Sequence, residues 1–316
     1  MDEISMFTAL RPPPPNDTEA IRERARARLD AALRQAHPGA VRPARRQRSR
    51  RRLGVLAAGA VAAAAGIAVA VPAVLPGNTS GASPAAARLL AKIATAAARQ
   101  PGPRVRDSQF WYIKSWVAYQ VCTYQRSGTF KCVLEKPHER QTWASVSNEC
   151  VTGLLREYGQ DTRLVFSSNY LHCPYRGGVH DPTYRFLQSL PTDPHALLGL
   201  IEQEMQGQLP RPEEAFTTIG DLLREAIAPP RVSAALYRAA ALIPGVTVVA
   251  HATDAIGRHG VAVAFTYQGV RSEWIFSKQT LQYIGERDIN IATGTTTGED
   301  AVLQRAFVNH AGQVPG

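Results

Sequence analysis

Cysteine is scarce in this sequence, and the first 121 of its 316 residues contain none. The four cysteines are Cys122, Cys132, Cys150 and Cys173. Their even number, after a long apolar segment, favours two disulfide bonds in an oxidising, extracytoplasmic location. The competing interpretations are free thiols or a zinc site, because His172 and His180 lie near Cys173. The spacing matches no standard zinc pattern, so we expect no metal ion.

Recognisable catalytic motifs are also missing. The sequence has no nucleophile elbow, HExxH motif, P-loop or dinucleotide-binding fingerprint. Its outer histidines stand in no motif, and we expect His251, His259 and His310 at the surface. Glu273 is expected to point outward from a strand. A triad can assemble from distant residues, so an enzyme stays an alternative. The prediction is a protein that is not an enzyme, with no catalytic residue and no cofactor.

Lysine is rare, and the basic charge is concentrated at one end of the chain. There are 5 Lys against 31 Arg, and 13 of the Arg lie in residues 1–52 beside 6 acidic residues, a net charge of +7. The whole chain carries +10, so the other 264 residues carry only +3. Binding driven by phosphate contacts needs a basic stripe on a folded domain. We therefore expect no nucleic-acid partner.

Residues 53–75 contain no charged side chain over 23 positions. A bilayer core of about 30 Å needs about 20 helical residues, so the segment is long enough to span it. Arginines precede it and an uncharged stretch follows, which predicts a cytoplasmic amino terminus and an extracytoplasmic domain. The alternatives are a buried core helix, a cleaved signal peptide, and a helix that pairs in the membrane through small residues. The favoured prediction is a single-pass transmembrane helix in the cell membrane.

The cytoplasmic segment 1–52 is expected to form one amphipathic helix over residues 18–36. Its apolar stripe consists of Ile21, Ala25, Leu29 and Leu33. One helix cannot bury a core by itself. The stripe could bind a groove on a partner protein or lie on the anionic inner leaflet, and a helix without a dedicated partner is the third alternative.

Residues 76–83 are expected to form a linker. Residues 84–316 are expected to form an extracytoplasmic domain. A helix is expected over residues 84–100, followed by strands at 110–125 and 129–145. Arg126-Ser127-Gly128 suits a three-residue hairpin in which Gln125 faces Thr129. In this register Cys122 faces Cys132 within disulfide distance, which leaves Cys150 to pair with Cys173.

The middle of the domain is predicted to be helical and its end to be strands. Asp193 is expected to cap a helix that begins at Pro194 and ends near residue 206, with further helices at 212–227 and 232–242. Strands are expected at 246–251, 258–267, 271–276, 281–288 and 301–310, with tight turns at Gly269-Val270 and Lys278-Gln279. The predicted fold class is α+β: a single transmembrane helix followed by a curved, mostly antiparallel sheet with a helical insert.

Several stretches resemble one group of actinobacterial single-pass membrane proteins of largely unknown function, typically encoded beside extracytoplasmic-function sigma factors. These stretches are the MDE start, Leu10-Arg11 with its proline-rich spacer, Ala31-Ala32-Leu33, Leu190 to Pro194, Pro244-Gly245-Val246 and Gly257 to Val261. The resemblance implies an anti-sigma-like regulator. Zinc-binding anti-sigma proteins carry an H-x3-C-x2-C motif, whereas here the cytoplasmic segment has His37 and no cysteine.

Two functions are therefore expected from the sequence. The first is a membrane regulator, whose outer domain senses a ligand or envelope state while its inner helix engages a cytoplasmic partner, plausibly a sigma factor. The alternative is a membrane-anchored protein that binds a lipid or another hydrophobic ligand, because the outer domain is similar to curved-sheet lipoprotein-carrier and periplasmic sensor folds. That similarity is one of fold alone.

Overall fold

The computed structural model describes residues 81–126, 128–147, 153–164, 177–205 and 209–316. The chain divides into two compact units, residues 1–71 and 72–316, and every described residue belongs to the second. The cytoplasmic segment, the stripe from Ile21 to Leu33 and the apolar segment 53–75 lie outside the described residues, as does the linker up to residue 80. Within the part of the chain that is described, no helix is long and apolar enough to cross a membrane.

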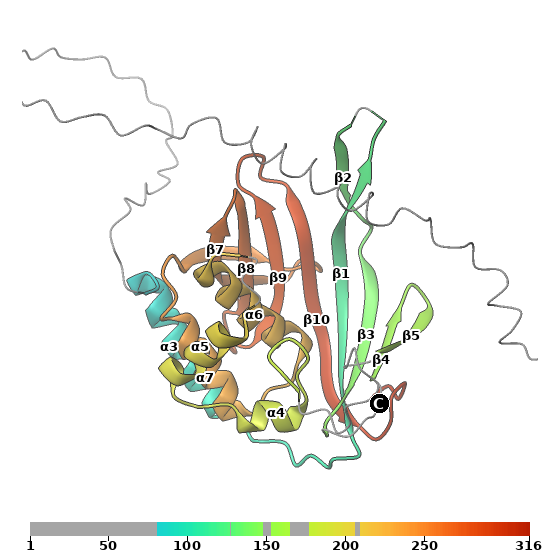
Figure 1. Cartoon of the computed structure of the whole chain (residues 1–316), viewed down its shortest axis with the longest axis vertical. Coiled ribbons are helices and arrows are strands. Elements are labelled where there is room, and N and C mark those ends of the chain that lie inside the picture. The colour runs from blue at the N-terminus through green and yellow to red at the C-terminus, as the bar shows by residue number, and fades with distance from the viewer. Residues whose placement is uncertain (1–80, 127, 148–152, 165–176, 206–208) are drawn as a thin grey trace, which may run out of the picture. The chain divides into compact units, whose positions relative to one another are not determined.

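The described strands form one antiparallel sheet of ten strands in the order β5-β4-β3-β1-β10-β9-β8-β7-β6, with β2 paired to an extension of β1 (Figure 1). The strands are β1 (Phe110–Tyr124), β2 (Phe130–Leu134), β3 (His138–Ser145), β4 (Gly153–Glu157), β5 (Gln160–Leu164), β6 (Thr247–Thr253), β7 (His259–Tyr267), β8 (Val270–Ser277), β9 (Tyr283–Asn290) and β10 (Thr296–Val308). The last strand, β10, pairs with the first strand, β1, so the two ends of the domain's chain meet in the middle of the sheet. The predicted α+β class with a mostly antiparallel sheet is confirmed.

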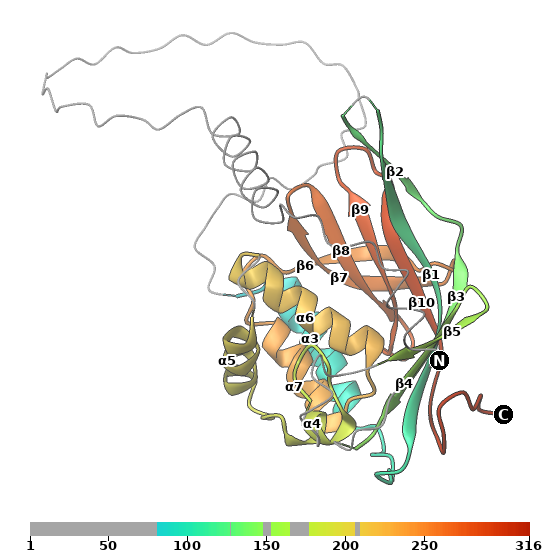
Figure 2. The same cartoon turned by 45° about the vertical axis from the view of Figure 1, so that its right-hand side comes forward.

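The described helices all lie on the same side of the curved sheet (Figures 1 and 2). They are α3 (Pro84–Ala98), α4 (Tyr184–Ser189), α5 (Pro194–Glu204), α6 (Arg211–Glu225) and α7 (Pro230–Ala240). The predicted cap is confirmed, because the Asp193 carboxylate accepts a hydrogen bond of 2.9 Å from the Ala196 amide and Pro194 opens α5. A side-chain oxygen at this position satisfies an amide that has no partner within the helix.

The main core lies between these helices and the covered face of the sheet. Its centre is a stack of Phe216 of α6 on Trp274 of β8, with ring centroids 3.8 Å apart and planes inclined by 7°. Phe265 of β7 lies 5.5 Å from Phe216 on the same face. At Gly220 a Cβ atom would lie only 2.5 Å from Nε1 of Trp274, so glycine lets α6 approach the sheet this closely.

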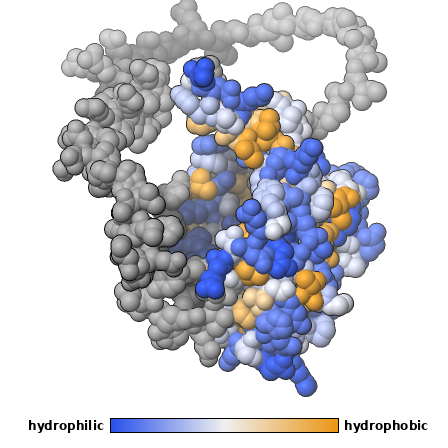
Figure 3. Space-filling model, turned by 90° about the vertical axis from the view of Figure 1, so that its right-hand side faces the viewer, coloured by the Kyte–Doolittle hydropathy of each residue, from blue (hydrophilic) through white to orange (hydrophobic). Residues whose placement is uncertain are grey.

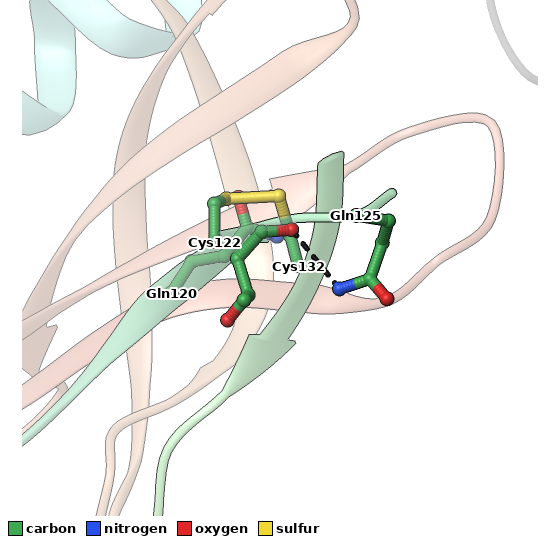
Figure 4. Close-up of a disulfide and its surroundings, with 5 residues drawn as sticks. Gln120, Cys122, Gln125 and Cys132 are labelled. Carbon is green, nitrogen blue, oxygen red and sulfur yellow. Dashed lines mark hydrogen bonds between the residues drawn. A yellow bond between two sulfur atoms is a disulfide. The ribbon is translucent and has the colours of Figure 1, made fainter. Parts of the chain in front are cut away.

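The predicted hairpin and disulfide are confirmed in β1 and β2 (Figure 4). Cys122 faces Cys132, and the two form a disulfide bond. The Gln125 amide donates a hydrogen bond of 2.8 Å to the Thr129 carbonyl, and Gly128 has a φ of +83°, as the three-residue turn requires. Cys150 and Cys173 lie outside the described residues, so their pairing stays a prediction.

Three predictions need correction. Glu273 does not point outward into water: it is 1% exposed, and its carboxylate accepts a hydrogen bond of 2.7 Å from Nε of Arg271. The turn between β7 and β8 is Gln268-Gly269, where both residues have positive φ, and Val270 already belongs to β8. The loop from β8 to β9 extends past Lys278-Gln279 to Gln282. Strands β4 and β5 and the short helix α4 were not predicted.

Candidate functional site

A cleft opens where two neighbouring strands of the sheet separate. Strands β9 and β10 pair from Ile289 and Thr296 to Gly285 and Ala301, and no pairing continues beyond that point. The freed carbonyls of Ile284 and Val302 are bridged by one side chain, because Nη2 of Arg258 donates to them at 2.7 and 3.0 Å. The guanidinium thus replaces the backbone donors that a continued ladder would have supplied.

Arg258 is held in place by the loop between β6 and β7. Its Nε lies 2.5 Å from Oδ2 of Asp254, whose side chain is fully buried. The other carboxylate oxygen of Asp254 accepts hydrogen bonds from the amides of Ile256 and Arg258, at 3.2 and 2.8 Å. A buried carboxylate needs such partners, so the loop and the arginine stabilise each other.

A second arginine reaches the cleft because β10 contains a bulge. Opposite the bond between Lys114 and Ser115 of β1, the register skips Leu303. A bulge changes which face the following side chains occupy. Arg305 consequently lies over the ring of Tyr283, 5.5 Å from its centroid, and donates a hydrogen bond to the Leu223 carbonyl of α6. Arg305 forms no ion pair with any residue that the structure describes.

The cleft has a volume of about 520 Å³ and lies between the ends of α3 and α7 and the parted strands. Its apolar lining includes Ala96, Ala97, Ile227, Ala228, Leu281 and Val302. Its polar lining includes Arg258, Arg305, Tyr237 and Tyr283. Burial raises the pKa of Tyr237 to about 12, so this phenol is neutral at physiological pH. The arrangement offers apolar surface beside two arginine cations, of which Arg305 has no ion-pair partner among the described residues.

Tyr283 connects the cleft to a group of ionisable side chains between α6 and the sheet. Burial, and then the nearby carboxyls of Asp300 and Glu286, raise the pKa of Tyr283 well above its usual value. The Tyr283 hydroxyl and Oε2 of Glu286 are buried with no hydrogen-bond partner among the described residues. Arg224 of α6 lies at the centre of this group, with Nη2 2.6 Å from Asp221 and Nη1 3.9 Å from Glu286.

The buried carboxyls hold their protons more tightly than exposed ones. Burial raises the pKa of Glu286 to about 8, although Arg224 opposes the shift. Burial also raises the pKa of Asp300 to about 6, with Arg224 and Arg305 acting in the opposite direction. The pKa of Arg224 is lowered by burial, but the carboxylates of Glu286, Glu225 and Asp221 outweigh burial and raise it overall. At neutral pH Glu286 is therefore largely protonated and Arg224 charged.

The residues singled out from the sequence do not meet at this cleft. Cys122 and Cys132 lie in the projecting hairpin. His138 lies between two glutamates, with Nε2 2.9 Å from Glu157, and stacks on Tyr158. His251, His259 and His310 are exposed, as predicted. Across the described residues, no group of three or more His, Cys, Asp or Glu side chains is placed to hold a metal ion.

Sequence reasoning missed Asp254, Tyr283 and Arg305, and it noted Arg258 only within a short stretch. The usable signal was the Gly257 turn: Gly257 has a φ of +84° and lets the chain reverse so that Arg258 returns to Asp254. The role of Arg305 depends on the bulge, for which the sequence carries no local signal.

We expect Arg258→Ala to lower the free energy of unfolding by about 2–4 kcal/mol. The substitution leaves the buried carboxylate of Asp254 without its cation and the carbonyls of Ile284 and Val302 without this donor. Urea denaturation of the domain from residue 76 onward measures this change. Arg88→Ala, which removes an exposed arginine from α3, is the matched control and should shift stability by no more than about 0.5 kcal/mol. An equal effect of the two variants would show that Arg258 does not hold the parted strands.

The chain was compared with known proteins. No protein-family model matches it, and no curated protein matches it.

Proposed function

We propose that the described domain is a binding module for an amphiphilic anion, such as a fatty acid or another acyl chain with an acidic head. The observation that carries this proposal is the cleft at the parted ends of β9 and β10. Its apolar lining suits the chain of such a ligand, and Arg305, a cation without an ion-pair partner among the described residues, suits the head.

Size and position support the same proposal. The volume of about 520 Å³ falls within the range of about 300–1,000 Å³ that is usual for small-molecule sites. The lining comes mainly from α3, α7, β9 and β10, together with the connection before α7 and the loop between β8 and β9. The ligand class agrees with the lipid-binding alternative expected from the sequence.

A fluorescent fatty acid and the corresponding fatty alcohol test the proposal by titration into the domain from residue 76 onward. We expect Ala96→Trp, which fills the cleft, to weaken binding of both probes by about tenfold or more. Ala91→Trp lies on the same helix at an exposed position that does not line the cleft, and it should leave binding unchanged. Arg305→Gln should weaken binding of the acid but not of the alcohol.

Equal effects of Ala96→Trp and Ala91→Trp would place any bound probe elsewhere on the domain. Binding of neither probe would contradict the proposal itself. Preference for the alcohol in the unmodified domain would contradict the anionic head while leaving an apolar ligand.

A regulatory role is the second candidate, and the order of segments in the sequence favours it. A binding module follows a predicted membrane anchor, which in turn follows a predicted amphipathic helix. In this second proposal, ligand occupancy outside alters what the inner helix binds, and that partner is a sigma factor. This candidate depends on residues 1–75, which lie outside the described residues.

A pull-down of soluble lysate with residues 1–52 tests the regulatory role. We expect recovery of one cytoplasmic protein, and its loss when Ile21, Leu29 and Leu33 are changed to Asp, because the apolar stripe is then charged. Changing Arg22, Arg26 and Arg28 to Gln keeps the stripe and is the control. Recovery of nothing specific, or of the same proteins with both variants, would leave binding outside as the function.

A further inference from the structure

The hairpin of β1 and β2 projects beyond the rest of the sheet. Pairing of β1 with β10 ends at Tyr119, and pairing with β3 ends at Val117. Residues 120–126 and 128–134, here called the arm, are held by pairing with each other and by the Cys122–Cys132 disulfide. Figures 1 and 2 show the arm extending past the neighbouring strands. A two-stranded ribbon is marginal in water, so the crosslink stabilises its shape.

The arm exposes large apolar side chains on both of its faces. Tyr124 faces Phe130, and these side chains are 65% and 69% exposed. Val121 faces Val133, and these are 48% and 53% exposed. Side chains alternate along a strand, so the aromatic pair and the valine pair lie on opposite faces. Figure 3 shows apolar surface close below the polar upper end of the described part. Exposed apolar clusters of this kind mark contact surfaces.

The charge of the arm has one sign. It contains Arg126 and Lys131 and no acidic residue, although the chain as a whole has 26 Asp and Glu. Lys131 directly follows Phe130 in β2, and Arg126 lies two residues after Tyr124, so basic and aromatic residues lie close together in sequence near the tip. Aromatic side chains concentrate in the interfacial region of bilayers, and basic side chains are attracted to anionic lipids.

We propose that the arm inserts its tip into the headgroup region of an anionic bilayer. A protein groove would cover one face of the ribbon and leave the other in water, whereas a bilayer surrounds both. The basic side chains complement anionic headgroups, and the closed disulfide lets the ribbon enter without fraying. The arm is thereby a membrane contact separate from the ligand cleft.

Tryptophan fluorescence of the full chain tests this insertion. The full chain carrying Tyr124→Trp is reconstituted in vesicles of phosphatidylcholine with phosphatidylglycerol, with and without brominated acyl chains, and the emission of the unmodified chain is subtracted. We expect the added tryptophan to be quenched at least about twofold more by brominated lipid than the one in Tyr158→Trp. Tyr158 is the matched control, because it is an exposed tyrosine, at 64%, in the turn between β4 and β5.

Charge reversal by Arg126→Glu with Lys131→Glu should remove the extra quenching, and so should vesicles of phosphatidylcholine alone. Quenching at position 124 no greater than at position 158 would overturn the proposal. Equal quenching in neutral and anionic vesicles would overturn the role of anionic lipid. A blue shift at position 124 that rises with the protein-to-lipid ratio, without quenching by bromine, would identify a second copy of the chain as the occupant and overturn insertion.

Discussion

Raising the pH from 5 to 9 should lower the free energy of unfolding of this domain by about 5 kcal/mol, and Glu286→Gln should remove most of that loss. Burial raises the pKa of Glu286 from 4.5 to about 8. Burial likewise raises the pKa of Asp300 from 3.8 to about 6. Above pH 4.5 the unfolded chain releases the Glu286 proton, whereas the folded domain keeps it until about pH 8.

The sign follows from proton counting. Between the unfolded and folded pKa values the folded state binds more protons than the unfolded state, so stability falls as pH rises. The full contribution is present below the unfolded pKa values and is lost as pH passes about 6 for Asp300 and about 8 for Glu286. Arg224 moderates the loss, because its charge stabilises the ionised carboxylate 3.9 Å away.

Urea denaturation at intervals of one pH unit measures this dependence. In Glu286→Gln the side chain stays neutral at every pH, so its curve should be flatter and its stability at pH 9 higher than in the unmodified domain. Ile275→Val is the control: it removes one buried methyl group from β8, costs about 1 kcal/mol and should shift the whole curve equally. Stability that rises between pH 5 and 9 would contradict the assignment.

The second large effect is expected at the stack of Phe216 and Trp274. Trp274→Ala should lower the free energy of unfolding by about 3–5 kcal/mol, because it opens a cavity between α6 and the sheet. Trp274→Phe should cost far less, since a ring remains on Phe216 and the buried indole Nε1 has no hydrogen-bond partner among the described residues. Urea denaturation measures both changes.

Gly220 provides a double-mutant test of the same contact. Gly220→Ala alone should destabilise the domain, because its Cβ would lie 2.5 Å from Nε1 of Trp274. In the Trp274→Ala background the same change should become neutral or favourable by about 0.5–1 kcal/mol, as alanine is the better helix former. Gly199→Ala in α5 is the control: no atom lies within 4 Å of its Cβ, so it should stabilise in both backgrounds. A purely additive result would contradict the close approach of α6.

The features that can be predicted from the sequence are local ones. The facing of Cys122 and Cys132 depends on a turn of three residues between two strands, and the Asp193 cap depends on residues within one helical turn. The helices at α3, α5, α6 and α7 follow from apolar residues repeating along one face. Such interactions act between neighbours in the chain, so the pattern of neighbours is sufficient to predict them.

The site depends on contacts between residues far apart in the chain. The pairing of β1 with β10 joins residues nearly 200 positions apart, and the bulge at Leu303 that turns Arg305 toward Tyr283 exists only within that pairing. Glu273 has the alternation of an outward strand residue, but Arg271 and the packed sheet enclose it. Arg258 donates hydrogen bonds to carbonyls of both β9 and β10 because these strands separate at that point. In each case the partner comes from a different part of the chain, and a polar side chain acquires its role from the environment that folding creates around it.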